Sequence, residues 1–296
     1  MTRTTAGGIH PLDHLVLPTQ SLDVARARLS SLGFIVAPTG IHPFGTENCC
    51  VFLADGTYLE PLAIGNAQAA MKASAEGNVF VTRDRIYRES RGDEGFSAVV
   101  LGTDNADADH ARYVEAGLSA GDTLSFSRAF TDTAGKSDTA SFKLAFASTG
   151  GATDAFLFAC QRINVPKVDR AALQAHANGA VGIVEVVAIS DEPVAQHRLI
   201  SVAVGAASAG GQGGSFHLPN TTLSVLDPAS FAARFGISAG SPTKLRFAAV
   251  VFAVRSADAV SRLLAANSIR YDIAGTDIVV QPASGQGAAF IFREIQ

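Results

Sequence analysis

Two ionisable side chains near the start of the chain stand on otherwise apolar segments. His14 precedes the run Leu15-Val16-Leu17, and Glu60 lies between Leu59 and Pro61. An imidazole is a good ligand for zinc, iron, nickel or manganese, although a core histidine can also be satisfied by hydrogen bonds alone. A carboxylate on an apolar strand needs a metal, a cation or a hydrogen-bond network, and an arginine partner would be the structural solution. The two residues therefore indicate a candidate site, and its occupant stays open.

A third ionisable side chain, His42, lies in the segment 40–48, where Pro43, Gly45 and Thr46 indicate a tight turn. Loops over a cleft often contact a ligand, so His42 could supply a further metal ligand or orient a substrate oxygen. An exposed turn histidine is an equally good interpretation. We expect an apolar part of the cleft to be lined by four aromatic side chains: Phe44, Tyr58, Phe156 and Phe158.

The elements that must position these residues follow a recurring order. Residues 12–17 alternate as a strand does and end at a proline, and the helical spacing of leucine and alanine over 22–32 predicts a helix. Strands are then predicted at 34–36, 48–53 and 58–63, and an Asp-Gly turn joins the last two. The order is strand, helix and three strands, which is a βαβββ unit.

Further units of this order are predicted to begin near residues 96, 183 and 248. One helix on a short curved sheet cannot bury both faces alone, so two units must pair around a cleft. The sequence therefore predicts an α+β protein in which four βαβββ units form two bowl-like half-barrels. We place the N-terminal domain at residues 1–170, with the site, and a degenerate C-terminal domain at 171–296.

Composition narrows the class of protein. The 296 residues suffice for two domains, and 47% of them are hydrophobic. The net charge is −4 and the Lys and Arg residues are scattered, which argues against nucleic acid and anionic membranes as partners. No run approaches the ~18 apolar residues of a spanning helix, and the first ten residues do not form a signal peptide. Three cysteines, Cys49, Cys50 and Cys160, suit reduced thiols and a cytoplasmic location.

Several motifs resemble the glyoxalase-like domains of the vicinal-oxygen-chelate superfamily. They are Leu12-Asp13-His14-Leu15-Val16, His42-Pro43-Phe44-Gly45-Thr46-Glu47-Asn48 and Tyr58-Leu59-Glu60-Pro61. Phe158-Ala159-Cys160-Gln161, followed by His176-Ala177-Asn178-Gly179-Ala180, is similar to the junction after the second unit in that group. The second half of the chain shares only the repeated architecture.

The resemblance implies glyoxalase-type half-barrels and, in the enzymes of the group, a divalent metal held by the first and fourth strands of each unit. It would make His14 and Glu60 metal ligands, and the metal (Zn, Fe, Mn or Ni) would act as a Lewis acid on substrate oxygens. Glu60 and His42 would be catalytic, and His42, Tyr58, Phe156 and Phe158 would contact the substrate. In the second unit, however, Ala98 and either Phe156 or Phe158 take the ligand positions and cannot bind a metal.

Two functions remain open at this point. The first is a small-molecule enzyme of lyase, isomerase or dioxygenase type, with or without a divalent metal. The second is a metal-free binding or resistance protein for a hydrophobic or aromatic compound. We expect a small-molecule ligand, no nucleic acid, no membrane and possibly a homodimer. In the second half Glu185 takes a first-strand position, Gly210–Gly214 suggests a flexible loop, and His176 is interpreted as a surface or capping residue of the linker.

Overall fold

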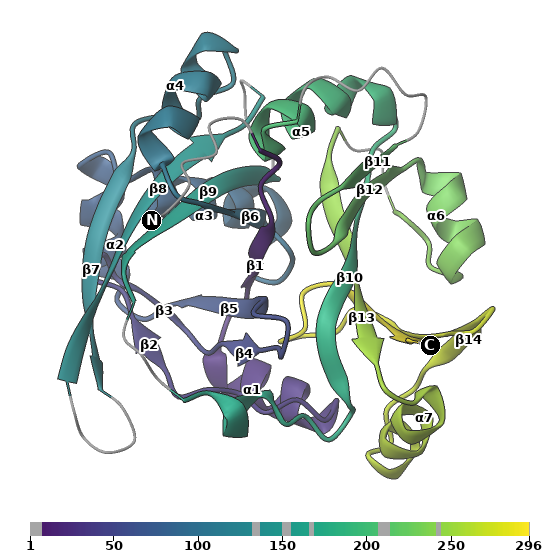
Figure 1. Cartoon of the computed structure of the whole chain (residues 1–296). Helices are drawn as coiled ribbons and strands as arrows, with labels where there is room; N and C mark the ends of the chain where they lie inside the picture. The colour runs from purple at the N-terminus through teal and green to yellow at the C-terminus, as the bar shows by residue number, and fades with distance from the viewer. Residues whose placement is uncertain are drawn as a thin grey trace.

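The computed structural model describes residues 8–131, 137–149, 155–165, 169–206, 214–240 and 244–295. Within these ranges the strands form two curved sheets that lie side by side (Figure 1). The first sheet contains nine strands in the described residues: β1 Leu12–Pro18, β2 Gly40–Ile41, β3 Thr46–Asn48, β4 Val51–Phe52, β5 Tyr58–Ile64, β6 Ala98–Thr103, β7 Leu124–Thr131, β8 Ser137–Ala147 and β9 Phe156–Asn164.

The strand order of the first sheet is β2-β3-β5-β1-β6-β9-β8-β7, with β4 paired to β5. Two parallel pairs, β1–β5 and β6–β9, meet through the antiparallel pair β1–β6. The register of β1 and β5 sets His14 beside Tyr58 and Val16 beside Glu60. Since side chains alternate along a strand, these four residues share one face of the sheet.

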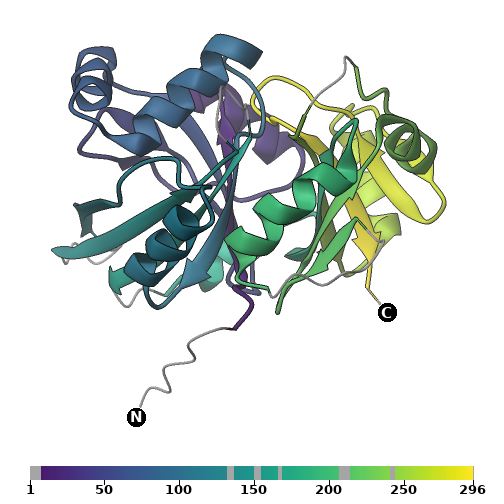
Figure 2. The same cartoon turned by 90° about the horizontal axis from the view of Figure 1, so that it is seen from above.

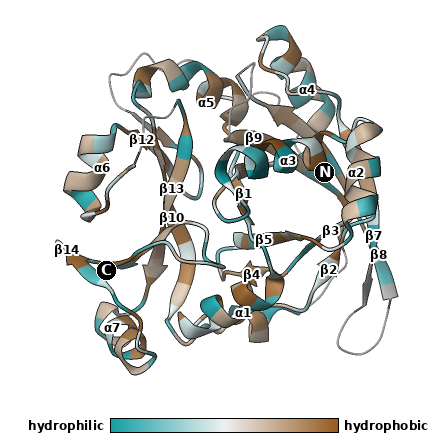
Figure 3. Ribbon diagram, turned by 180° about the vertical axis from the view of Figure 1, so that it is seen from behind, coloured by the Kyte–Doolittle hydropathy of each residue, from teal (hydrophilic) through white to brown (hydrophobic). Residues whose placement is uncertain are grey.

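Four helices accompany this sheet: α1 Leu22–Ser31, α2 Ala67–Ala75, α3 Val79–Arg91 and α4 Ala106–Glu115. Each begins after a residue whose side chain accepts a hydrogen bond from a backbone N–H of the first turn, namely Ser21, Asn66, Asn78 and Asn105. The α2–α3 pair covers part of the face that carries Val16, because Phe80 and Val81 of α3 join its hydrophobic cluster. Helices α1 and α5 carry both apolar and polar residues, as covering helices do (Figure 3).

The second sheet has the order β11-β12-β10-β13-β16-β15-β14. Its antiparallel centre β10–β13 is again flanked by parallel pairs, β10–β12 and β13–β16. The strands are β10 Ala180–Ile189, β11 Ser215–His217, β12 Thr222–Leu226, β13 Arg246–Val254, β14 Asp272–Ala274, β15 Asp277–Val280 and β16 Ala289–Glu294. The helical segments are η1 Ala171–Gln174, η2 Pro193–Gln196, α5 His197–Val204, α6 Pro228–Phe235 and α7 Ala257–Ala266.

The two sheets share one hydrophobic core, and Figure 2 shows them packed against each other. The ring of Phe34 lies 5.2 Å from that of Phe252 and 6.0 Å from that of Phe290, both in the second sheet. The Asp55 turn also joins the sheets: its N–H donates to the carbonyl of Val181, and its carboxylate accepts the N–H of Ile183. The sheets are therefore joined by apolar and polar contacts alike.

The structure confirms the α+β class and the curved, strand-rich sheets, whereas the number of repeats and the boundary at residue 170 stay predictions. The expected strand 34–36 is absent from the described residues, since the N–H of Ile35 donates to the imidazole of His176 instead of to a neighbouring strand. Helices α2, α3 and α6 were not foreseen. Residues 210–213 of the glycine-rich segment lie outside the described residues.

None of the helices in the described ranges has the length and apolar character needed to cross a bilayer.

Candidate functional site

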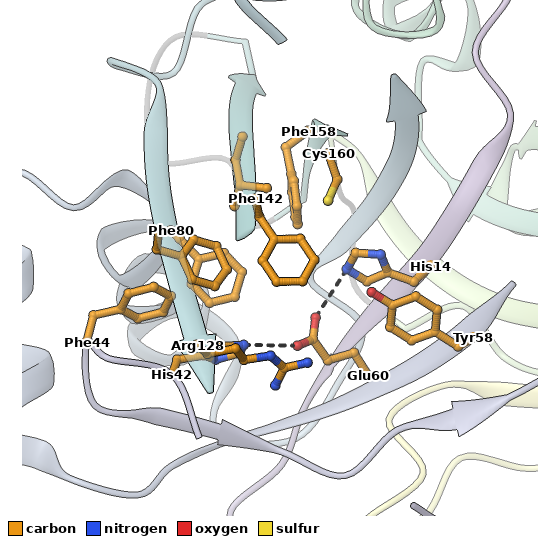
Figure 4. A pocket seen from close by; sticks show the side chains of 12 residues that line it. His14, His42, Phe44, Tyr58, Glu60, Phe80, Arg128, Phe142, Phe158 and Cys160 are labelled. Carbon is orange, nitrogen blue, oxygen red and sulfur yellow. Dashed lines mark ion pairs between the residues drawn. The ribbon is translucent and has the colours of Figure 1, made fainter. Parts of the chain in front are cut away.

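The concave face of the first sheet contains a cavity walled mainly by aromatic rings (Figure 4). The space that the centre of a water-sized molecule can occupy in it is about 40 Å³, and the surrounding hollow, which includes open solvent, is about 410 Å³. Strands β1, β5, β7, β8 and β9, the 40–48 segment and helix α3 supply the lining: His14, His42, Phe44, Tyr58, Glu60, Phe80, Phe126, Arg128, Phe142, Leu144, Phe158 and Cys160.

Glu60 is the central polar group of this cavity. The residue is 5% exposed. Its Oε2 lies 3.2 Å from Nε2 of His14, and its Oε1 accepts a 2.6 Å hydrogen bond from the amide of Asn48. Burial opposes ionisation of the carboxyl group, but the hydrogen bonds and the charge of His14 outweigh it and lower the pKa of Glu60 to about 2. Glu60 is therefore a carboxylate at neutral pH.

His14 is held between two carboxylates. Its Nδ1 lies 2.6 Å from Oδ1 of Asp13, which in turn accepts a hydrogen bond from Arg162 at 2.7 Å, and its ring stacks on Tyr58 with centroids 4.3 Å apart. Burial lowers the pKa of His14, yet the hydrogen bonds to Asp13 and Glu60 raise it more, and the net shift is upward. The protonated imidazole is thus stabilised on both ring nitrogens.

The pKa of His42 is shifted in the opposite direction to that of His14. Its Nδ1 lies 2.8 Å from the hydroxyl of Thr46, while its Nε2 lies 3.4 Å from Nδ2 of Asn48 and 3.7 Å from Oε1 of Glu60. Burial lowers the pKa of His42 to about 4, against the attraction of Glu60. His42 is therefore a neutral imidazole and not the exposed turn residue of the alternative interpretation: it is 6% exposed and stacks on Phe44.

The structure brings together six of the seven residues expected at the site, because all of these line the cavity: His14, His42, Phe44, Tyr58, Glu60 and Phe158. Phe156 lies outside the lining: its ring stacks on Phe158 at 5.8 Å and faces the guanidinium of Arg83. Arg128, Phe126, Phe142, Leu144 and Phe80 line the cavity without having been singled out from the sequence. Alternation of Leu124, Phe126 and Arg128 on a predicted strand was the available signal for one shared face.

The corresponding face of the second sheet is filled. Phe231 and Phe235 of α6 pack in one cluster with Val187 and Ala249 of the central strands. The carboxylate of Glu185 accepts hydrogen bonds from three side chains. Arg234 donates to Oε1 at 2.7 Å, and Ser224 and Arg293 are the other two donors. Glu185 is thus paired within the chain, and the polar cavity described above belongs to the first sheet.

Whether His14, Glu60 and His42 fit a divalent metal depends on where their donor atoms point. Two imidazoles and a carboxylate are suitable donors for a transition metal. However, Nε2 of His14 approaches Oε2 of Glu60 whereas Nε2 of His42 approaches Oε1, and the Asn48 amide donates a hydrogen bond to that same Oε1. In the described part of the chain no three His, Cys, Asp or Glu side chains are grouped to hold a metal ion. The donors are right in kind but do not converge as placed.

Residues 12–203 match the glyoxalase-like domain family, and the chain belongs to that family. A hypothetical protein from Staphylococcus aureus is similar in structure with a TM-score of 0.64 and 14% identity, over 96% of this chain and 99% of that one. A mutant of 4-hydroxymandelate synthase from Streptomyces coelicolor has a TM-score of 0.60 and 12% identity, over 97% of this chain and 93% of that one. No curated protein matches the sequence significantly.

The Mn(II)-bound glyoxalase from Novosphingobium aromaticivorans also has a similar structure, with a TM-score of 0.50 and 10% identity over 97% of this chain and 82% of that one. At such identities the structural likeness shows a shared fold. Together with the family match, it confirms the vicinal-oxygen-chelate superfamily that the motifs around His14, His42 and Glu60 indicated.

Proposed function

We propose that the chain is a small-molecule-binding protein of the vicinal-oxygen-chelate superfamily, and that its ligand occupies the aromatic cavity without a resident divalent ion. One observation carries this proposal: Glu60 is already satisfied by Asn48 and His14 inside a cavity whose remaining walls are mainly aromatic. Aromatic walls with a few placed polar groups are typical of sites for flat organic ligands. His42, Tyr58 and Phe158 would contact the ligand.

The pKa values of Glu60 and His42 make these two groups poor general bases. A general base works best when its pKa lies near the working pH. The pKa of Glu60 is about 2 and that of His42 about 4, so both groups are weak bases at neutral pH. They are suited to orienting a ligand through hydrogen bonds.

The second candidate function is a divalent-metal-dependent lyase, isomerase or dioxygenase. His14 and Glu60 favour it, because their donor atoms lie 3.2 Å apart on adjacent strands at the positions where the superfamily holds metals. It would require His42 or another donor to turn toward the same side of Glu60. Zinc, iron, manganese and nickel are the ions that this donor set would suit. A cytoplasmic location and a homodimer remain proposals under either function.

Thermal unfolding with two kinds of additive separates these functions. We expect phenol, indole or benzoate to raise the melting temperature of the wild-type protein, because a ligand at 100 times its Kd adds about 2.7 kcal/mol to the free energy of unfolding. Phe142→Ala, which removes a cavity wall, should reduce this shift. Lys72→Ala is the control, since Lys72 is exposed on α2.

Manganese and zinc ions should leave the melting temperature unchanged. If either ion stabilises the wild type but not Glu60→Gln, the metal-dependent function replaces the one proposed. If neither aromatic compounds nor ions stabilise the protein, a ligand in this cavity is refuted.

A further inference from the structure

Arg128 is half-buried and lines the cavity, yet within the described ranges no carboxylate forms an ion pair with it. Some other half-buried arginines do have such a partner, as Arg162 has in Asp13. The guanidinium carbon of Arg128 lies 6.0 Å from the ring centroid of Phe142. A permanent cation without an ion-pair partner therefore lines the same cavity as Glu60.

The chain leaves room for this guanidinium at Gly40. A Cβ on Gly40 would overlap Nη1 of Arg128 and would come within 2.5 Å of Oδ1 of Asn48. Arg128 thus crosses directly over the β2 backbone, and it reaches the end of the cavity that holds His42 and Asn48. Because Gly40 has no side chain, it leaves space both for the guanidinium of Arg128 and for the amide of Asn48, which donates to Glu60.

Glu60 does not serve as the missing partner. Its two oxygens are engaged by His14 and Asn48, and its separation from the Arg128 guanidinium exceeds ion-pair distance. His42, whose pKa the charge of Arg128 helps to lower, cannot supply a negative charge in either protonation state. An anion supplied by the ligand would complete the site.

We propose that Arg128 binds the carboxylate of an aromatic acid whose ring packs against the wall formed by Phe126 and Phe142. This inference rests on the proposed function, because it needs a ligand in the cavity. A guanidinium presents a planar pair of N–H donors that matches both oxygens of a carboxylate, and it retains its charge at any physiological pH. The two phenylalanines lie 5.1 Å apart on β7 and β8 and, with Phe44 at 5.2 Å from Phe126, form an apolar wall beside the cation.

Binding of 3-fluorobenzoate and its neutral isostere 3-fluorobenzamide, followed by ¹⁹F NMR titration, tests the assignment. We expect the wild type to bind the acid at least about tenfold more tightly than the amide, as a charge-assisted hydrogen bond implies. Arg128→Gln should remove this preference, and Arg128→Lys should retain part of it. Gly40→Ala keeps the charge of Arg128 but displaces its guanidinium. This variant should bind the acid more weakly than the wild type does and bind the amide with unchanged affinity.

Lys143→Gln is the matched control. It removes one positive charge from the neighbouring strand β8, but Lys143 pairs with Asp107 on α4 and does not line the cavity. Its preference for the acid should equal that of the wild type. Inorganic phosphate should compete with the acid weakly, because it has no ring to place among the phenylalanines.

The possible failures are distinguishable. If the wild type binds neither probe, the proposed ligand site and this inference both fall. If it binds both probes equally, or if Arg128→Gln keeps the preference for the acid, Arg128 is not the anion anchor and the aromatic site itself stands. If phosphate competes as well as the acid does, the cavity recognises anions without the ring.

Discussion

At the scale of single residues, the surroundings of three buried histidines make one of them, His14, cationic and leave His42 and His176 neutral. His14 faces two carboxylates, and its pKa is raised. His42 is surrounded by rings, a hydroxyl and an amide, and its pKa falls to about 4. His176 is 8% exposed and accepts the N–H of Ile35 at Nδ1 while Nε2 donates to the carbonyl of Phe52. A backbone donor on one side and a backbone acceptor on the other select the neutral tautomer.

This arrangement predicts a pH dependence of stability at His176. Burial lowers its pKa in the folded protein, against the carbonyl of Phe52, whereas in the unfolded chain the pKa is about 6.5. The histidine therefore contributes its full stability above pH ~6.5 and loses it as the pH falls below that value. We expect the free energy of unfolding, measured in urea between pH 8 and pH 5, to fall less steeply in His176→Gln than in the wild type. Parallel curves for the two proteins would contradict this account.

At the scale of elements, the end of α1 shows how one turn joins both halves of the molecule. Gly33 follows Leu32, the C-cap of α1, and has a φ of +85°. A Cβ there would come within 2.9 Å of the backbone nitrogen of Asn178 and of the side chain of Leu263 on α7. Asn178 also donates its side-chain amide to the carbonyl of Leu32. The turn is thus tight because the linker and a helix of the second half pack against it.

Gly33→Ala and Gly77→Ala measure that packing separately from backbone strain. Gly77 ends α2 with nearly the same φ, +87°, but a Cβ there meets nothing within 4 Å. We expect Gly77→Ala to cost about 1–2 kcal/mol for the left-handed backbone alone. Gly33→Ala should cost about 1–3 kcal/mol more, because the added methyl overpacks the contact between halves. If chemical denaturation shows the same loss of unfolding free energy for both variants, the residues around Gly33 can move to accommodate the added methyl group without cost.

At the scale of the whole molecule, the shared core predicts joint unfolding of the two sheets. Phe34, on the connection after α1, packs among Phe252, Phe290 and Phe292 of the second sheet. Phe34→Ala should therefore lower the free energy of unfolding by about 3–5 kcal/mol. Ile41→Ala is the control, because Ile41 is 71% exposed and its removal should change stability by less than about 0.5 kcal/mol.

The number of transitions tests the same contact in the unmodified protein. We expect calorimetry of the wild type to show one unfolding transition, since neither sheet can unfold without exposing part of the shared core. Two resolved transitions, with Phe34→Ala affecting only one of them, would mean that the halves fold independently. That result would support separate domains at 1–170 and 171–296.

The sequence alone predicted much of this protein, because the strand and helix periods are local. Alternation over 12–17 and 58–63 anticipated β1 and β5, and with them one face for His14 and Glu60. The superfamily motifs lie on these same segments, so they too could be read without a structure.

Only the tertiary structure decided the surroundings of those residues. Arg162 reaches Asp13 across 149 positions, and Arg128 reaches the space above Gly40, through strand pairings that no local pattern specifies. The donor atoms of His14 and His42 approach opposite oxygens of Glu60, a matter of side-chain direction that spacing cannot express. Local periodicity thus predicted that His14 and Glu60 share one face, while long-range packing determined the rest of the cavity lining, the charges and partners of these residues, and the unpaired cation at Arg128.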